Sequence, residues 1–184
     1  MSTETVTQQA VPAGTYTVDP VHSTIHFAVV HNGVATFRSG FEAYEAKLEG
    51  GEAPKLTGTV EVDSIDINED QLKGHLLSPD FFDAERHPQL KFESTEIALG
   101  EGNEVTVRGQ LEIRGQTHEV QASGRIGQVG ADLGGNARVG LSLATRIDRR
   151  SFGLDWNADL PSGGQALEFD VDIAVDLELV AEAE

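Results

Sequence analysis

The chain has 184 residues, a length suited to one well-buried domain rather than two. Its formal net charge of -18, from 13 basic and 31 acidic residues, repels phosphate backbones and anionic membrane surfaces, so we expect no nucleic-acid partner. Cysteine is absent, which excludes disulfides, thiolate metal ligands and a cysteine nucleophile.

The N-terminal segment predicts a flexible tail over 1–14, followed by a single domain over 15–182. This segment is polar and carries Glu4 where a secretory signal would need basic residues and then an apolar stretch. No later stretch is long and apolar enough for a transmembrane helix. We therefore expect a cytoplasmic protein without an integral membrane segment.

Most of the remaining chain alternates apolar and polar residues with the period of two that is typical of half-buried β-strands. In the last such stretch, apolar residues from Leu167 to Leu179 alternate mainly with acidic ones. The stretches expected to form strands are 25–31, 37–41, 56–62, 90–99, 105–113, 118–126, 139–147 and 167–179.

Two features favour a curved, closed sheet. The apolar side changes parity between Val62 and Ile65, and again between Phe92 and Ile97, as a bulge or sharp bend would cause. Several of the 20 glycines lie inside strands, where they permit curvature. We predict an all-β fold, an antiparallel eight-stranded up-and-down barrel, with a β-sandwich as the alternative.

Between two of these strands lies a short helical insert around 69–82. Asn68 to Asp70 is typical of a helix start, and Leu72, Leu76 and Leu77 share one side of the helix. Ser78-Pro79 ends the helix because a residue before proline avoids the helical region. Phe81 and Phe82 then predict a lid over an apolar cavity, with Asp80, Asp83, Glu85 and Arg86 facing water.

A barrel of eight strands either fills its interior with its own side chains or holds one small ligand. Ala122 and three glycines on inward rows, Gly58, Gly109 and Gly124, favour unfilled space, whereas large side chains opposite them would fill it. The residues alone leave both interiors open.

Four motifs in order resemble the YceI-like family: 16–23 (YTVDPVHS), 75–83 (HLLSPDFFD), 111–115 (LEIRG) and 147–154 (IDRRSFGL). The similarity covers about Tyr16 to Val180. It implies a lipocalin-like barrel with an elongated hydrophobic cavity that binds isoprenoid or other long-chain lipids, often as a dimer. It implies no established catalytic activity, and no cofactor apart from a bound isoprenoid or fatty-chain lipid.

Polar residues give no firm catalytic or metal site. His22 and His26 are four apart, but on a strand that spacing separates them by about 13 Å, so no metal site is predicted. The acidic residues near Asp83 resemble a catalytic carboxylate pair, but 31 acidic residues make chance clusters common. No GxSxG motif is present, and no catalytic residue is predicted.

Basic residues are concentrated in one region, since Arg125, Arg138, Arg146, Arg149 and Arg150 fall within 26 positions. They either bind an anionic lipid head group or balance neighbouring acids on the outer face. The candidates for head-group contact are His75, Arg149 and Arg150.

The residues expected to form the cavity and lid are mostly large and apolar. Two of them, Phe152 and Trp156, either line the cavity or cap the end of the barrel. The full set is Ile25, Phe27, Val29, Phe41, Leu76, Leu77, Phe81, Phe82, Phe92, Leu111, Val120, Ala122, Leu141, Phe152, Trp156 and Phe169.

Three functions stay open. The first is binding of a long-chain amphiphilic lipid, of isoprenoid quinone or prenyl phosphate type, for storage or transport. The second is a hydrolase acting on an amphiphile, which requires a polar cluster inside the cavity. Few inward residues are polar: His31, Ser39, Ser94, His118 and Thr145. The third is a stress-related scaffold with a packed barrel and an exposed apolar patch.

Overall fold

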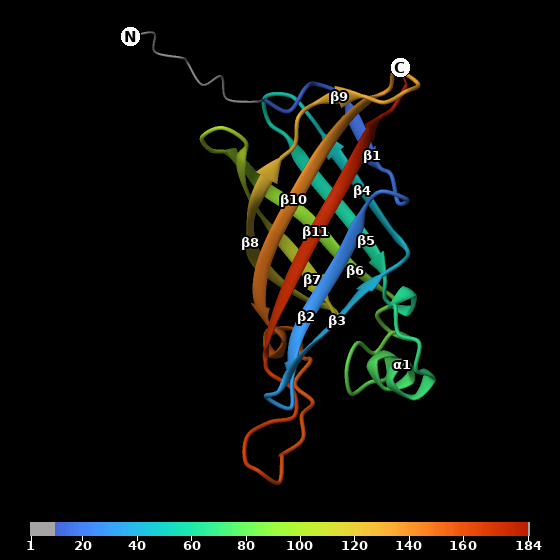
Figure 1. Ribbon diagram of the computed structural model, residues 1–184, viewed down its shortest axis with the longest axis vertical. Coiled ribbons are helices and arrows are strands. Elements are labelled where there is room, and N and C mark those ends of the chain that lie inside the picture. Colours follow the sequence, from blue (N-terminus) through green and yellow to red (C-terminus); the bar gives the residue numbers. More distant parts are fainter. Residues whose placement is uncertain (1–9, 184) are drawn as a thin grey trace.

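A computed structural model describes residues 10–183 as one antiparallel sheet closed into a barrel, with a short helix at one end (Figure 1). The strands are β1 (Thr15–Val18), β2 (Thr24–His31), β3 (Ala35–Phe41), β4 (Tyr44–Glu49), β5 (Lys55–Glu61), β6 (Gln89–Leu99), β7 (Glu104–Ile113), β8 (Gln116–Ile126), β9 (Gly130–Ala131), β10 (Ala137–Asp148) and β11 (Asp170–Ala181). The helices are α1 (Asp70–Leu77) and two 3-10 turns, Val62–Ser64 and Arg149–Phe152. No helix among the described residues is long and apolar enough to cross a membrane.

The predicted eight-stranded up-and-down barrel is confirmed, because four of the short strands form two long ones. β1 and β2 lie end to end along β11, where Val18 pairs with Leu179 and Thr24 with Asp176. β3 and β4 likewise follow one another and pair with β2 and β1. From β4 the ladder continues through β5, β6, β7, β8 and β10 to β11, which closes the ring.

The sequence pattern located the irregular positions of this sheet. The register of the β6–β7 ladder shifts between Ser94 and Glu96, which is the predicted bulge. At the other parity change the chain leaves the barrel through the 3-10 turn at Val62–Ser64 and returns at β6. Three strands were not identified in the pattern: β1 as a separate element, β4 and the two-residue β9. The last strand begins at Asp170 rather than Leu167.

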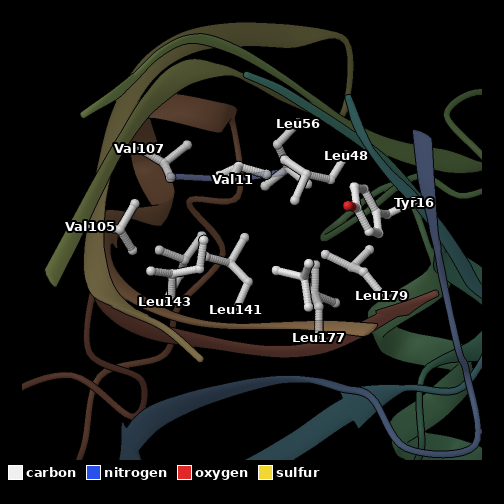
Figure 2. Packing of buried hydrophobic residues seen from close by; sticks show 12 residues of the cluster. Val11, Tyr16, Leu48, Leu56, Val105, Val107, Leu141, Leu143, Leu177 and Leu179 are labelled. Atoms are coloured by element: carbon white, nitrogen blue, oxygen red, sulfur yellow. The ribbon is translucent and has the colours of Figure 1, made fainter. Parts of the chain in front are cut away.

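A packed core fills the end of the barrel where β1 begins and β11 ends. Its buried residues come from strands all around the barrel, and Figure 2 shows their side chains meeting across the interior. The cluster consists of Val11, Tyr16, Leu48, Leu56, Val105, Val107, Ile126, Val139, Leu141, Leu143, Leu177 and Leu179. This end of the barrel is therefore closed by side chains.

The prediction of a flexible tail over 1–14 was wrong for its last residues. Val11 is buried in the core, and the backbone of this segment bonds to the turn after β4: Gly50 N–H donates to the Gly14 carbonyl and Gly51 N–H to the Val11 carbonyl. Burial of the apolar Val11 side chain holds this segment against the barrel. The polar residues around Val11 gave no indication of this burial. Residues 1–9 of the predicted tail lie outside the described residues.

Candidate ligand-binding cavity

The other half of the barrel holds a cavity of about 500 Å³, a volume in the range of small-molecule sites. Its floor is formed by residues that also belong to the packed core, Leu56, Leu143 and Leu177. Its walls are aliphatic and aromatic side chains of the strands. At the far end the lining continues to Leu72 and His31, whose side chains are exposed, so the cavity opens to solvent there.

The opening lies between the insert and the loop that joins β10 to β11, which extend from the same end of the barrel in Figure 1. A second buried cluster surrounds it: Phe81 from the insert, Ile113 from β7, and Phe152 and Leu154 from the start of the loop. We call this end the mouth.

The insert begins and ends as the sequence indicates. The Glu69 carboxylate caps α1 by accepting hydrogen bonds from the N–H groups of Gln71 and Leu72, and Ser78 ends it in an extended conformation. One side of the insert, Leu72, Leu76, Phe81 and Phe82, lines the cavity. The expectation that Asp83 faces water was wrong: its left-handed backbone, with φ of 51°, tucks the side chain inward, where it is 4% exposed.

The structure brings most of the predicted cavity residues together around this space. Those that line it are Ile25, Phe27, Val29, Phe41, Leu76, Phe81, Phe82, Phe92, Leu111, Val120, Ala122, Phe152 and Trp156. Three do not. Leu77 is on the side of α1 away from the cavity, Leu141 lies in the packed core, and Phe169 lies under the guanidinium groups of Arg149 and Arg150.

The small inward residues have different roles. Gly58 and Ala122 line the cavity and leave it open. At Gly109 the ring of Phe92 occupies the missing side chain's place, since a Cβ there would lie 2.5 Å from Phe92 Cζ. A Cβ on Gly124 would lie 1.8 Å from the Ser142 carbonyl oxygen, so this glycine permits close approach of β8 and β10 rather than empty space.

Arg149, a predicted head-group contact, lines the cavity, and its guanidinium is bonded to the backbone. Its side chain is buried, and it donates to four backbone carbonyls of the β10–β11 loop: Glu168 at 2.9 Å, Leu154 at 2.6 Å, Trp156 at 2.9 Å and Leu167 at 3.1 Å. Burial lowers the pKa of the guanidinium, and these carbonyls supply the hydrogen bonds that water would otherwise make. The arginine thereby fixes the loop beside the mouth.

Arg114 performs the same task for the insert. It lies in the β7–β8 turn with φ of 51° and donates to the carbonyl of Gly153 at 2.5 Å and that of Pro79 at 2.7 Å. One guanidinium thus joins the insert to the loop across the mouth. The sequence offered no sign of this role beyond the position of Arg114 in a turn.

His75 lies in an aromatic cluster at the mouth. Its ring meets Phe81 and Trp156 edge-on, with centroid distances of 5.0 and 4.7 Å, and its Nε2 is 3.5 Å from Asp80 Oδ2. Phe81 and Trp156 also contact each other at 5.4 Å. This cluster links the insert to the loop and lines the cavity. Of the three candidate head-group residues, His75 and Arg149 line the cavity and Arg150 does not.

The remaining arginines of the basic region mostly balance acids on the outer face. Arg146 pairs with Asp172 at 2.7 Å, and Arg150 is hydrogen-bonded to Asp148. Arg138 pairs with three carboxylates, those of Asp19, Asp132 and Glu178, at 2.6 to 3.0 Å. Of the two interpretations of this region, the structure supports charge balance for these three residues.

Asp19, His22 and Glu178 place potential metal-ligand atoms within 4.8 Å of one another. The sequence suggested only His22 with His26, a pair that the strand spacing excluded, and gave no indication of Glu178, which is distant in the chain. The positive charge between the two carboxylates is supplied by Arg138, whose Nη1 bonds to both. Hydrogen bonds from Arg138 and His22 hold the pKa of Asp19 far below its usual range, and the Asp19 carboxylate raises the pKa of His22.

The inward polar residues do not form a cluster within the cavity. Ser39 donates to the Asp66 carbonyl, Ser94 accepts from the Leu56 N–H and Thr145 donates to the Gln121 carbonyl. His118 is exposed and packs its ring against Phe152. These hydroxyl groups satisfy the backbone of the barrel.

Comparison with known proteins identifies the family. A sequence model of the YceI-like domain matches residues 16–179. A UPF0312 protein of Staphylococcus epidermidis is 31% identical over 157 residues, covering 83% of this chain and 89% of its own, and one from Vibrio cholerae is 28% identical over 151 residues, covering 79% and 80%.

Solved structures share the fold. The crystal structure of Burkholderia cenocepacia BcnA superposes with a TM-score of 0.74 at 23% identity, covering 90% of this chain and 99% of that one. A polyisoprenoid binding domain from Saccharophagus degradans, implicated in plant cell wall breakdown, gives a TM-score of 0.71 at 14% identity, covering 91% and 98%. The match over residues 16–179 and the resemblance of the four motifs agree, and the chain belongs to the YceI-like family.

Proposed function

We propose that this protein binds a long-chain isoprenoid lipid in the barrel cavity and holds it for storage or transport. The observation that carries the proposal is the cavity itself, about 500 Å³, closed by Leu56, Leu143 and Leu177 at one end and open at the other. A lining this apolar suits a hydrocarbon chain. The structural neighbour from Saccharophagus degradans, a polyisoprenoid binding domain, supports the same class of ligand.

Burial of apolar surface supplies enough affinity. A prenyl chain that loses about 400 Å² of accessible surface gains about 10 kcal/mol at about 25 cal/mol per Å², before the cost of ordering it is subtracted. Dissociation constants in the micromolar range or below therefore need no specific polar contact. Catalysis receives no comparable support, since the serine and threonine hydroxyls named above are committed to backbone groups.

A pair of matched substitutions tests the proposal. Ala122 lines the cavity, and Ala98 on β6 is exposed on the outer face. Ala122→Phe should fill part of the cavity and reduce binding of a radiolabelled polyprenol at least tenfold, whereas Ala98→Phe should leave binding unchanged. Native mass spectrometry of the purified protein should show a bound lipid in the wild type that is diminished in Ala122→Phe. Equal polyprenol binding by the two variants would contradict a ligand site inside the barrel.

A further inference from the structure

Strand pairing in the barrel wall is incomplete between β8 and β10. Toward the mouth, their ladder ends where Ala144 pairs with Ser123. The ladders on either side, β7–β8 and β10–β11, continue to the strand ends nearest the mouth. Residues 145–148 of β10 and 116–122 of β8 therefore belong to no β8–β10 pair. We call the boundary between these two stretches the seam.

Few contacts hold the seam closed. Among the described residues, a single side-chain hydrogen bond crosses it, from the Thr145 hydroxyl to the Gln121 carbonyl at 2.7 Å. Nearer the mouth, the 3-10 turn Arg149–Phe152 lies against β8. There the His118 ring meets the Phe152 ring edge-on, with a centroid distance of 5.1 Å. One neutral hydrogen bond and one pair of rings thus take the place of a ladder.

The cavity extends to this seam. Residues on both of its sides line the cavity, Val120 and Ala122 from β8 and Thr145 from β10. His118 belongs by alternation to the inward row of Val120 and Ala122, yet it is exposed, so the wall is open to solvent at that position. Phe152 lines the cavity beneath it and is 2% exposed. The ring of Phe152 therefore separates the cavity from the solvent at His118.

The mouth is held more firmly than the seam. Arg114 joins the insert to the loop through the carbonyls of Pro79 and Gly153, and Arg149 fixes the loop through four more. Hydrogen bonds from a charged donor are stronger than the neutral bond of Thr145. A long hydrocarbon chain would also have to pass end-first through the mouth, whereas a slit along the wall admits it sideways.

We propose that the seam is a side entrance to the cavity. β8 and β10 separate below Ser123, the ring of Phe152 moves aside, and the hydrocarbon chain of the ligand enters between the strands. The paired stretch from Ser123 to Ile126 stays closed and acts as the hinge. The proposal rests on the proposed function, because it concerns how the same ligand reaches the same cavity.

A disulfide across the seam tests the entrance, and the absence of cysteine from the chain leaves no competing thiol. Gln121→Cys with Arg146→Cys places two exposed positions opposite each other just beyond the ladder. The control is Ala144→Cys with Ala174→Cys, an exposed pair within the β10–β11 ladder. Mass spectrometry confirms each disulfide. Trp156 is the single tryptophan and lines the cavity, so its fluorescence follows uptake of nonaprenol from neutral detergent.

The oxidised seam variant should take up nonaprenol at least tenfold more slowly than the same protein after reduction. The oxidised and reduced forms of the control should take it up at equal rates. Equal rates for the two forms of the seam variant would overturn the side entrance and leave the proposed function intact. Failure of the wild type to bind nonaprenol at all would instead overturn the proposed function.

A second variant opens the seam instead of locking it. Thr145→Val removes the hydroxyl that bonds to the Gln121 carbonyl and should raise the uptake rate severalfold. Thr95→Val is the matched control, since its hydroxyl donates to the Arg108 carbonyl within the paired β6–β7 ladder. It should leave the uptake rate unchanged. A Thr145→Val variant that takes up nonaprenol no faster than Thr95→Val would contradict opening at the seam.

Discussion

Arg138 donates from Nη1 to Asp19 Oδ2 at 2.8 Å, joining the turn between β1 and β2 to a strand 119 positions later in the chain. The same guanidinium holds Asp132 and Glu178, and it keeps the pKa of Asp19 far below its ordinary value near 3.8. A carboxyl group whose pKa is lowered by folding stabilises the protein above its unfolded pKa, and this contribution is lost as the pH falls through the folded value.

Asp19→Asn should therefore lower the melting temperature at neutral pH, and the gap to the wild type should close as the pH falls below about 4. His22 adds an opposite trend. Its pKa is raised by Asp19, so its contribution is complete below its unfolded pKa, near 6.5, and is lost as the pH rises through the folded value. The difference in melting temperature between Asp19→Asn and the wild type should therefore be largest between about pH 4 and about pH 6.5. Melting curves across pH measure it.

The control for this pair is Glu96→Gln, which removes a carboxylate from an ion pair with Arg108 in which both side chains are more than half exposed. Such pairs contribute little, so its melting temperature should follow the wild type at every pH. A constant gap for Asp19→Asn from about pH 3 to about pH 7 would contradict the ionic explanation.

Arg149→Lys should destabilise the protein although the charge is kept. A lysine has three donors on one nitrogen and cannot reach the four carbonyls that the planar guanidinium serves, so buried carbonyls lose their partners. We expect the free energy of unfolding in urea to fall by about 2–4 kcal/mol. Arg150→Lys, next in the chain but exposed, should change it little. Similar stability of the two variants would show that the carbonyl contacts are not important for folding.

The barrel could be predicted from the sequence, whereas the contacts of Arg149 could not. Alternation predicted the barrel because each strand has one apolar side, whatever its partners. The alternation also extends over β4, where Tyr44, Ala46 and Leu48 alternate with charged residues. The small Ala46 weakened the pattern, and this strand was not predicted. The acceptors of Arg149 lie 5 to 19 residues away in an irregular loop, and no periodicity records them.

The cavity lining could also be predicted only in part from the sequence. Alternation says which face of the sheet a side chain is on, but not how far along the barrel axis it lies. Leu141 and Leu143 share a face of β10, yet only Leu143 reaches the cavity, and Leu141 belongs wholly to the packed end. On α1, Leu76 lines the cavity and Leu77 does not, because adjacent residues on a helix point about 100° apart.

The two phenylalanines of the insert should behave differently. Phe82 is only partly buried, lines the cavity and meets the ring of Phe41 at 6.2 Å, so Phe82→Ala should weaken polyprenol binding by about 1–3 kcal/mol with a small loss of stability. Phe81 is 4% exposed and packs against His75 and Trp156, so Phe81→Ala should cost about 3–5 kcal/mol of stability. Melting temperature and affinity are measured on both. A large stability loss in Phe82→Ala with unchanged affinity would exclude a lid role for this residue.

Gly109→Ala should destabilise the barrel by about 1–3 kcal/mol, because the new methyl group would lie 2.5 Å from both the Phe92 ring and the Glu93 carbonyl oxygen. Gly58→Ala is the matched control, also on an inward row, where the nearest atom to a Cβ is the Glu45 carbonyl oxygen at 3.4 Å. It should fold normally. Urea titrations of both variants decide the comparison, and equal stability would show that Phe92 moves aside at little cost.

The leucines at the closed end give the cavity a fixed depth. This depth limits the length of a hydrocarbon chain that the cavity can hold. If the proposed function holds, each isoprene unit added to the ligand should lengthen its contact with the walls until the end of the chain meets Leu56, Leu143 and Leu177. Further units should stay outside in water and add no affinity. Affinity plotted against the number of isoprene units should rise and then level off. The number of units at which it levels off would report the depth of the cavity.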